Sequence, residues 1–578
     1  MMRRLDPMRL REDRRGNFAV LGAIVMVPVV GAVGLAADYS EILRTRSHIA
    51  EALDAAAFVA ADGYAKKRSG AAITQDSAAV FRANLDENGV SETVVYTYDG
   101  FFTGEDANFI RVRAQTQVQP RFMPVLWAML DKNGLSQGGS GEDGEEGNDR
   151  SGSGGGIDLG LKSEVAVATS TVELALVLDN SGSMDGNKLK ALKSAASKLV
   201  EDLHGAVAPN SEPNAVQFAI VPFAGAVNVG PGNKSASWMD TAGKSSIHHE
   251  NFDWTTLSGA SKQNGVWKKN GKVLNRFWLF DEVSVDWGGC VEARPYPLNV
   301  DDTAPSAGNP DSYFVPMFAP DTPTRYKRDG KWESWYTNSY IEDDFLGRSS
   351  ASNQDSSYHG AAQHARQSWM RKYEQTGRVS NQPISVGPNY ACTSIPIMPL
   401  TASRRDALEH LDDMRAEGAT SIAEGAAWGL RTLSPGEPFT GGRAYGSERN
   451  IKAMVVMSDG ENTYYTDNNR NESTYGPYGF SANGRIFDGT DYHRSSDFSR
   501  AMDSHLLKVC EAAKAKSIMV FTIAFDVDNR SPVKALLERC ASLDRDGKPN
   551  YYNATSNKEL ETAFGMIGSK VSGVRLYR

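Results

Sequence analysis

The sequence predicts an α/β protein: a doubly wound, mostly parallel sheet with a large loop-rich insertion, preceded by a transmembrane helix and a small α+β domain. Three observations support this fold class. In the second half of the chain, short apolar segments alternate with amphipathic ones, as in parallel sheets that are covered by helices on both faces. Residues 227–388 interrupt the alternation, and an uncharged apolar run stands near the N-terminus.

The first predicted element is that apolar run, FAVLGAIVMVPVVGAVGLAA at residues 18–37. About 20 apolar residues are enough to cross a hydrocarbon core of about 30 Å as a helix. A buried core helix usually shows a polar stripe, and a cleaved signal peptide has a shorter apolar region of about 7–15 residues. We therefore favour a transmembrane helix that contacts the lipid bilayer over these two alternatives.

The charge that flanks the run sets its orientation. Residues 1–17 contain a cluster of arginines: Arg3, Arg4, Arg9, Arg11, Arg14 and Arg15. Because basic residues favour the cytoplasmic side of a membrane, we expect residues 1–17 to be a cytoplasmic basic segment. The chain should then cross a bacterial inner membrane once, with its bulk in the periplasm.

The next region, residues 38–132, is predicted to be an amphipathic stalk followed by a small α+β domain. Residues 38–67 show helical periodicity, and residues 91–97 and 108–118 are rich in β-branched residues, as strands are.

Residues 133–158 are predicted to be a linker, since they contain a Gly/Ser-rich acidic stretch that cannot bury enough apolar surface to fold. We expect it to separate the membrane-proximal domain flexibly from a larger domain at residues 159–578.

The larger domain carries the α/β alternation. Strands are expected at the apolar runs 172–178, 216–223, 451–457 and 518–525. Amphipathic helices are expected at residues 189–203, 402–416, 421–432, 499–516, 532–542 and 557–569.

The insertion at about residues 227–388 is loop-rich and contains most of the tryptophans: Trp238, Trp254, Trp267, Trp278, Trp287, Trp332, Trp335 and Trp369. We favour an insertion whose tryptophans pack its own small core, with an aromatic recognition surface as the alternative.

Composition limits the partners and the cysteine chemistry. The net charge of −9 argues against nucleic acid. The four cysteines show no zinc-type spacing, so they are disulfides if the domain is exported or buried thiols if it is not. Chain position suggests the pairs Cys290–Cys392 and Cys510–Cys540, although spacing leaves the connectivity open. His248 and His249 lie in a polar, loop-like stretch, where we expect them to be solvated.

Five oxygen-bearing side chains stand where the chain leaves a strand or enters a helix. Asp179, Ser181 and Ser183 form D-x-S-x-S after the first strand, Asp459 follows the strand 451–457, and Thr420 begins a helix. The carboxyl ends of parallel strands meet at one edge of a sheet.

This pattern points to a metal site. A small hard cation prefers oxygen ligands and retains waters, so the hydroxyls can bind it directly while the aspartates hold waters and supply charge. An ordinary turn is the alternative, because Asp and Ser favour turns and helix starts. The recurrence of such residues after two strands and before a helix favours a single divalent ion: Mg²⁺, or Mn²⁺ or Ca²⁺.

Together, DNSGSM, GATS and VVMSDGEN resemble the metal-ion-dependent adhesion site of von Willebrand factor A domains. The resemblance covers about residues 171–226 and 389–572. It implies that Ser181, Ser183 and Thr420 contact the metal directly and that Asp179 and Asp459 act largely through water. It also implies a protein partner that offers an acidic residue.

The N-terminal sequence from RRGNFAVLG to AFVAA is similar to the start of TadG-like proteins of the Flp (Tad) pilus assembly system, as are VPFAGAVNVG and the C-terminal end. Members of that family join such an anchor to an exported von Willebrand A-like domain, and pilus or other envelope components are the implied partners. Pilin-like members carry a glutamate five residues after a glycine cleavage point, where this chain has Leu21 after Gly16. This departure argues against prepilin-type processing.

Three functions are compatible with these features. The favoured one is a metal-dependent binding protein of pilus assembly or surface attachment, without catalysis. A magnesium-dependent hydrolase or phosphatase with Asp179 as nucleophile would also need an adjacent general acid and basic groups for phosphate, which the motif does not supply. The third is a structural anchor with a vestigial metal site.

Overall fold

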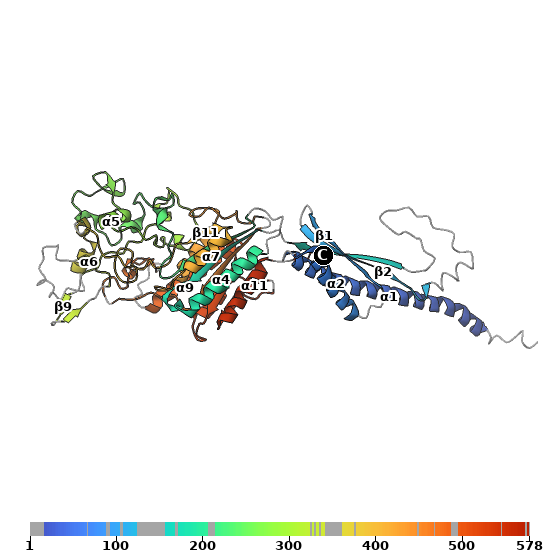
Figure 1. The fold of residues 1–578 in the computed structure, drawn as a ribbon. Helices are drawn as coiled ribbons and strands as arrows, with labels where there is room; N and C mark the ends of the chain where they lie inside the picture. Colours follow the sequence, from blue (N-terminus) through green and yellow to red (C-terminus); the bar gives the residue numbers. More distant parts are fainter. Residues whose placement is uncertain are drawn as a thin grey trace, which may run out of the picture. The chain divides into compact units, whose positions relative to one another are not determined.

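The computed structural model describes residues 17–65, 68–87, 93–103, 108–123, 157–167, 171–205, 214–323, 326–328, 331–333, 337–341, 361–374, 377–447, 450–467, 469–486, 495–544, 546–572 and 575–576. The chain divides into two compact units (Figure 1), of which the first comprises Met1–Thr169 and Val574–Arg578 and the second Ser170–Gly573.

The first unit is an antiparallel four-stranded sheet with helices packed on it. The helices are α1 (Asn17–Ala65) and α2 (Gly70–Glu87). The strands β1 (Val95–Thr103), β2 (Asn108–Val118), β3 (Ile157–Val167) and β15 (Arg575–Leu576) pair in the order β1-β2-β3-β15. Its core consists of apolar side chains from both helices and the sheet, including Ile49, Leu53, Ala56, Phe81, Ile110 and Val112.

β1 begins and ends later than the predicted strand at 91–97. The register between β1 and β2 shifts between Tyr98 and Gly100, and Gly100 has a φ of 102°. Glycine adopts this backbone conformation without steric cost, so the strand continues through a bulge to Thr103.

Helix α1 runs without a break from the predicted span at 18–37 into the predicted stalk. The side chains of residues 17–24 and 27–28 lie outside the described part of the chain. Among the residues described, no helix has both the length and the apolar character needed to cross a membrane. Asp38, directly after the apolar run, is buried and accepts hydrogen bonds from the backbone N–H groups of Arg121, Phe122 and Met123 at 2.9, 2.8 and 2.7 Å.

The predicted linker does not stand between the two units. Residues 157–158, which we placed in the linker, and 159–167, which we placed in the larger domain, form β3. β3 pairs along its whole length with β2, so the Gly/Ser-rich stretch connects two neighbouring strands of one sheet. Local composition indicates that a segment will not form a core, but only strand pairing decides which elements it connects.

The second unit is built on a six-stranded sheet with the order β11-β5-β4-β12-β13-β14. Its strands are β4 (Thr171–Asp179), β5 (Val216–Phe223), β11 (Met398–Thr401), β12 (Asn450–Ser458), β13 (Met519–Phe525) and β14 (Tyr551–Ala554). All neighbours are parallel except the β11–β5 pair. The α/β prediction is thus confirmed, and the two short edge strands β11 and β14 were missed.

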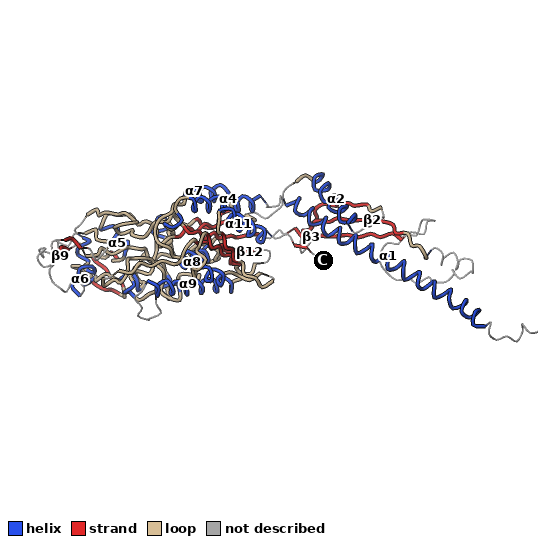
Figure 2. Tube along the Cα trace, turned by 90° about the horizontal axis from the view of Figure 1, so that it is seen from below, coloured by secondary structure: helices blue, strands red, loops and turns tan. Residues whose placement is uncertain are grey.

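Helices cover both faces of this sheet, as Figure 2 shows. One face packs against α4 (Asn187–Gly205), α7 (Arg404–Asp413) and α11 (Asn557–Ser572). The other packs against α8 (Ile422–Thr432), α9 (Ser495–Ala515) and α10 (Val533–Cys540). The central strand β4 is buried at every position, which explains its nearly continuous apolar sequence.

The insertion lies between β5 and β11 and has little regular structure. It contains a three-stranded sheet of β6 (Ser261–Gln263), β7 (Val266–Lys269) and β8 (Lys272–Val273), the pair β9 (Tyr326–Arg328) and β10 (Lys331–Glu333), and the helices α5 (Arg276–Glu282) and α6 (Ala361–Ser368).

Among the described residues, the insertion has no core built from its own side chains alone. Its buried tryptophans Trp238, Trp254, Trp278 and Trp287 belong to the same apolar cluster as strand and helix residues of the main sheet. Phe314 of the insertion packs against Trp428 of α8 with ring centroids 4.8 Å apart. For these tryptophans a packing role is observed; the side chains of Trp332 and Trp335 lie outside the described residues.

Both suggested disulfides are present. Cys290 pairs with Cys392 and Cys510 with Cys540, and the bonds close loops with sequence separations of 102 and 30 residues. The first bond fastens the insertion to the segment just before β11, and the second joins α9 to α10.

The expectation that His248 and His249 are solvated is wrong for the first and only partly right for the second. His248 is fully buried, with Nε2 2.8 Å from the backbone oxygen of Asp240 and Nδ1 accepting from the Arg276 N–H at 3.4 Å. Burial and the charge of Arg276 hold the pKa of His248 well below its usual value. His249 is partly buried, and burial lowers its pKa to about 4.

Removing the long-range disulfide should destabilise the second unit. A loop of this size contributes about 4–5 kcal/mol through the entropy of the unfolded chain, so the double variant Cys290→Ser/Cys392→Ser should lose a stability of that order in denaturant titrations. Cys510→Ser/Cys540→Ser, with its shorter loop, should lose about 1 kcal/mol less. Free thiols detected after denaturing the oxidised protein would contradict the pairing.

The buried histidines should make the second unit acid-sensitive. The unfolded chain protonates histidine below about pH 6.5, whereas the folded state keeps His248 and His249 neutral. The contribution of these two histidines to stability is therefore full above pH 6.5 and falls between pH 6.5 and 5, by at most about 1.4 kcal/mol per pH unit for each histidine. The slope of unfolding free energy against pH in this range should flatten in His248→Gln and also in His249→Gln.

Candidate metal-binding site

Asp179 ends β4 at the carboxyl edge of the sheet, and its side chain is fully buried. Its Oδ1 accepts a hydrogen bond from the backbone N–H of Ser181 at 2.8 Å. Its Oδ2 accepts one from the hydroxyl of Ser458 at 2.6 Å. These bonds hold the carboxylate in one orientation at the end of the central strand.

The loop after β4 brings the Ser183 hydroxyl to Asp459 and the Ser181 hydroxyl next to that of Ser183. β12 runs parallel to β4 with Met457 opposite Leu178, so Asp459 leaves the sheet next to this loop. Ser181 Oγ lies 3.0 Å from Ser183 Oγ, and Ser183 Oγ donates to Asp459 Oδ1 at 2.6 Å. The Asp459 carboxylate is buried whereas Ser183 is exposed, so the group opens to solvent on the serine side.

The segment that contains Thr420 is docked on the same loop by backbone hydrogen bonds. The N–H of Gly182 donates to the oxygen of Gly418 at 3.0 Å, and the N–H of Glu417 donates to the oxygen of Asn180 at 2.9 Å. Thr420 follows two residues after Gly418 and is buried. The far-downstream threonine therefore lies in a loop that directly contacts the D-x-S-x-S turn.

This docking needs a glycine at position 418. Gly418 has a φ of +96°, and a Cβ there would lie 2.6 Å from Thr393 Oγ1. On the other side of the loop, the N–H of Thr420 donates to Thr463 Oγ1 at 3.1 Å and the N–H of Thr463 donates to the Thr420 oxygen at 2.9 Å. Thr420 is thus held between the turn after β4 and the segment after β12.

The structure brings four of the predicted residues into one hydrogen-bonded group and places the fifth in the adjoining loop: Asp179, Ser181, Ser183, Asp459 and Thr420. Two further residues were missed. Ser458, which orients Asp179, is the last residue of β12, and Lys188, in the first turn of α4, reaches Asp459 Oδ2 at 2.8 Å. Both could have been suspected from their neighbours in the sequence: Ser458 directly precedes Asp459, and Lys188 directly follows the turn at residues 179–187.

The charges of the group are not balanced. Lys188 pairs with Asp459 and, at 3.3 Å, with Asp526. Burial, with the added repulsion of Asp459, raises the pKa of Asp179 to about 6, although hydrogen bonds from Ser181 and Ser458 oppose the shift. The charged form of Asp179 is therefore unfavourable in this arrangement, and a cation at the site would stabilise it.

The residue types fit a small oxygen-seeking cation. Two carboxylates and several hydroxyls offer hard oxygen ligands with a modest negative charge, as Mg²⁺ prefers. Among the described residues, no group of three or more His, Cys, Asp or Glu side chains is placed to hold a metal ion. A metal at this edge of the sheet would thus rely on serine and threonine hydroxyls as well as carboxylates.

Two families match separate parts of the chain. The von Willebrand factor type A domain matches residues 173–235, and the Flp pilus-assembly TadE/G-like family matches residues 16–63. Both resemblances drawn from the sequence are confirmed: β4 to β5 lie in a von Willebrand factor A-type region, and α1 begins in a TadE/G-like region. No curated protein matches the chain.

Solved structures that resemble the chain include three proteins. The first is the pilus adhesin SpaC from Lactobacillus rhamnosus GG, with a TM-score of 0.28 and 10% identity, covering 82% of this chain and 34% of that one. The second is the vWF domain of the type V pili tip protein Mfa5 from Porphyromonas gingivalis, with a TM-score of 0.28 and 10% identity, covering 70% of this chain and 95% of that one. The third is mussel byssus proximal thread matrix protein 1 with a zinc-occupied MIDAS motif, with a TM-score of 0.26 and 10% identity, covering 72% of this chain and 50% of that one. The chain thus spans about a third of SpaC. These TM-scores are too low to establish a shared fold.

Lys188 should compete with a bound divalent cation, because its ammonium group already neutralises Asp459. Replacing it in Lys188→Met removes a positive charge beside the site and should tighten Mg²⁺ binding by roughly 3–30-fold in isothermal titration calorimetry. Lys198→Met is the matched control, since Lys198 lies on the same helix, is exposed and pairs with Asp202. Weaker binding in Lys188→Met would instead show that the lysine positions Asp459.

Proposed function

We propose that this chain, with its von Willebrand factor A-type region and TadE/G-like N-terminus, is a membrane-anchored, exported protein that binds a partner through one divalent metal ion. The ion is Mg²⁺, or Mn²⁺ or Ca²⁺, and the partner is a protein that offers an acidic residue, such as a pilus or other envelope component. Pilus assembly or surface attachment is the proposed setting, and the TadE/G-like match supports it.

The observation that carries this proposal is the convergence at the carboxyl edge of the sheet. Residues far apart in sequence meet there through Ser183 Oγ and Asp459 Oδ1 and through the docked loop of Thr420. Ser181, Ser183 and Thr420 would hold the ion directly, and Asp179 and Asp459 would hold its waters. An ion with few charged ligands strongly attracts a further carboxylate. Because Ser183 is exposed, a carboxylate of the partner would approach the ion from that side.

The same geometry disfavours catalysis by Asp179. Its side chain is fully buried, and both carboxylate oxygens accept hydrogen bonds within the protein. A carboxylate nucleophile must be ionised and must reach the substrate, and a buried carboxylate with both oxygens engaged does not meet the second condition. A magnesium-dependent phosphatase is therefore the weaker candidate, and a structural anchor with a vestigial metal site is the remaining one.

The proposed topology places residues 1–17 in the cytoplasm, residues 18–37 in the inner membrane as a single span, and the rest in the periplasm. The arginine cluster before the apolar run supports the orientation. Two disulfides support an exported second unit, because disulfides persist in oxidising compartments.

Asp179→Asn should abolish metal binding while leaving the fold intact. Titration of full-length protein in detergent with Mg²⁺, Mn²⁺ and Ca²⁺ should show one site in the wild type and a loss of affinity of at least about 100-fold in the variant. Because the buried charge of Asp179 is unfavourable, the melting temperature in EDTA should be unchanged or higher.

The matched control is Asp185→Asn, which makes the same change on an exposed carboxylate of the same loop and should bind metal normally. Capture of envelope proteins by the immobilised full-length chain should then require metal, and should fail with EDTA and with Asp179→Asn. Absence of metal binding by the wild type would favour the vestigial site, and capture that ignores both treatments would reject metal-dependent recognition.

A further inference from the structure

A cavity of about 370 Å³ opens beside the candidate metal site. Its lining includes Gly182 from the D-x-S-x-S turn, Gly418 and Ala419 from the loop of Thr420, and Thr463, which holds that loop. Its volume lies within the range of about 300–1,000 Å³ that is usual for ligand pockets. The cavity and the candidate site therefore share their walls.

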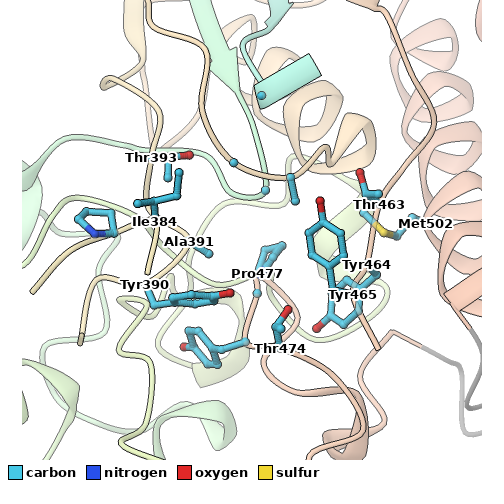
Figure 3. A pocket seen from close by; sticks show the side chains of 17 residues that line it. Ile384, Tyr390, Ala391, Thr393, Thr463, Tyr464, Tyr465, Thr474, Pro477 and Met502 are labelled. Carbon is cyan, nitrogen blue, oxygen red and sulfur yellow. The ribbon is translucent and has the colours of Figure 1, made fainter. Parts of the chain in front are cut away.

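The remaining lining side chains come from two parts of the chain, as Figure 3 shows. The insertion and the segment that joins it to β11 contribute Pro383, Ile384, Tyr390, Ala391 and Thr393, and the region after β12 together with α9 contributes Tyr464, Tyr465, Thr474, Tyr475, Pro477 and Met502. The 17 lining residues contain no charged side chain, and tyrosine is the most frequent large one.

Most hydroxyls in this lining are already used within the protein. Thr393 Oγ1 donates to the backbone oxygen of Glu417 at 2.9 Å, and Tyr464 OH donates to that of Gly479 at 2.7 Å. The Tyr475 hydroxyl bonds to the buried Glu292. With these polar groups engaged, the cavity offers mainly ring faces and alkyl groups, so it suits an apolar ring better than an ion.

Two large apolar side chains at this cavity are exposed. Ile384 is 58% exposed and Tyr465 is 56% exposed. Apolar side chains exposed next to a concave, uncharged lining are typical of a surface that a protein partner covers. The two residues come from opposite walls, one from the insertion and one from the segment after β12.

The walls are held in place by strong internal contacts. The bond between Cys290 and Cys392 anchors the insertion next to Thr393. Buried Glu292 of the insertion pairs with Arg276 and with Arg485 of the segment after β12. The cavity is therefore formed in advance of binding, which lowers the entropy lost when a ligand enters.

We propose that this cavity receives one aromatic side chain of the partner, in the same segment as the acidic residue that binds the metal. The inference rests on the proposed metal-dependent function for the acidic half of the recognition. Because the D-x-S-x-S turn lines the cavity, a few residues of extended chain, at about 3.3 Å each, are enough to connect the two anchors. The acidic residue supplies metal dependence and the aromatic residue supplies specificity.

The test is a selection of random peptides displayed on phage, with purified full-length protein in Mg²⁺ as the target. Selected peptides should contain Asp or Glu and, at a fixed spacing, Tyr, Phe or Trp. Changing that aromatic residue to alanine in a synthetic peptide should weaken its dissociation constant by about 10–100-fold in fluorescence anisotropy.

The variants Ile384→Ala and Tyr465→Ala alter only exposed side chains, so the fold should be kept. Each should raise the dissociation constant of the aromatic peptide by about 3–10-fold and leave that of its alanine derivative unchanged. Leu543→Ala is the matched control: Leu543 is 67% exposed and does not line the cavity.

The outcomes separate this inference from the proposed function. Acidic peptides without a fixed aromatic residue, or an aromatic preference that both cavity variants retain, would overturn the cavity assignment and leave metal-dependent recognition standing. If peptides with the aromatic residue are still selected in EDTA, the proposal that one segment binds the metal and the cavity together would be overturned. Glycan binding that is lost in Tyr465→Ala, without aromatic enrichment, would show that the cavity serves a sugar instead.

Discussion

The parallel pairing of β4 with β12 is the constraint on which the rest of the site depends. It sets the ends of two buried strands side by side, so that the carboxylates of Asp179 and Asp459 meet at one edge of the sheet. Two like charges in a buried setting repel each other, and the strands' apolar burial has to hold them there. A cation bound at this edge would relieve that electrostatic conflict.

The insertion is part of the same structural unit as this edge. Its aromatic side chains are continuous with the core on the α8 face, and Phe314 packs on Trp428. Charged side chains inside it are also paired, as in the buried contact between Arg276 and Glu292. Such a fixed insertion can present one wall of a cavity at the candidate metal site, which a loosely attached loop could not do with the same accuracy.

The first unit is formed by residues that precede the second unit in the sequence together with a few residues that follow it. The chain leaves it after β3 and returns to it at β15, which pairs with β3. The second unit is therefore an insertion in the first, connected to it at both ends. The Gly/Ser-rich stretch lies instead between β2 and β3, where its length does not disturb their continuous pairing.

The sequence by itself determined the buried strands β4, β5, β12 and β13, the helices that cover them, and the candidate site residues that the structure brings together at one edge of the sheet. Buried strands such as β4 and amphipathic helices such as α4 depend on local periodicity, and the D-x-S-x-S turn is a local motif. Only the tertiary structure decided that β3 belongs to the first unit, that His248 is buried, that Ser458 and Lys188 join the site, and that a cavity adjoins it. These features depend on contacts between residues far apart in the chain, such as Lys188 with Asp459, and no local pattern encodes which distant segments will pair.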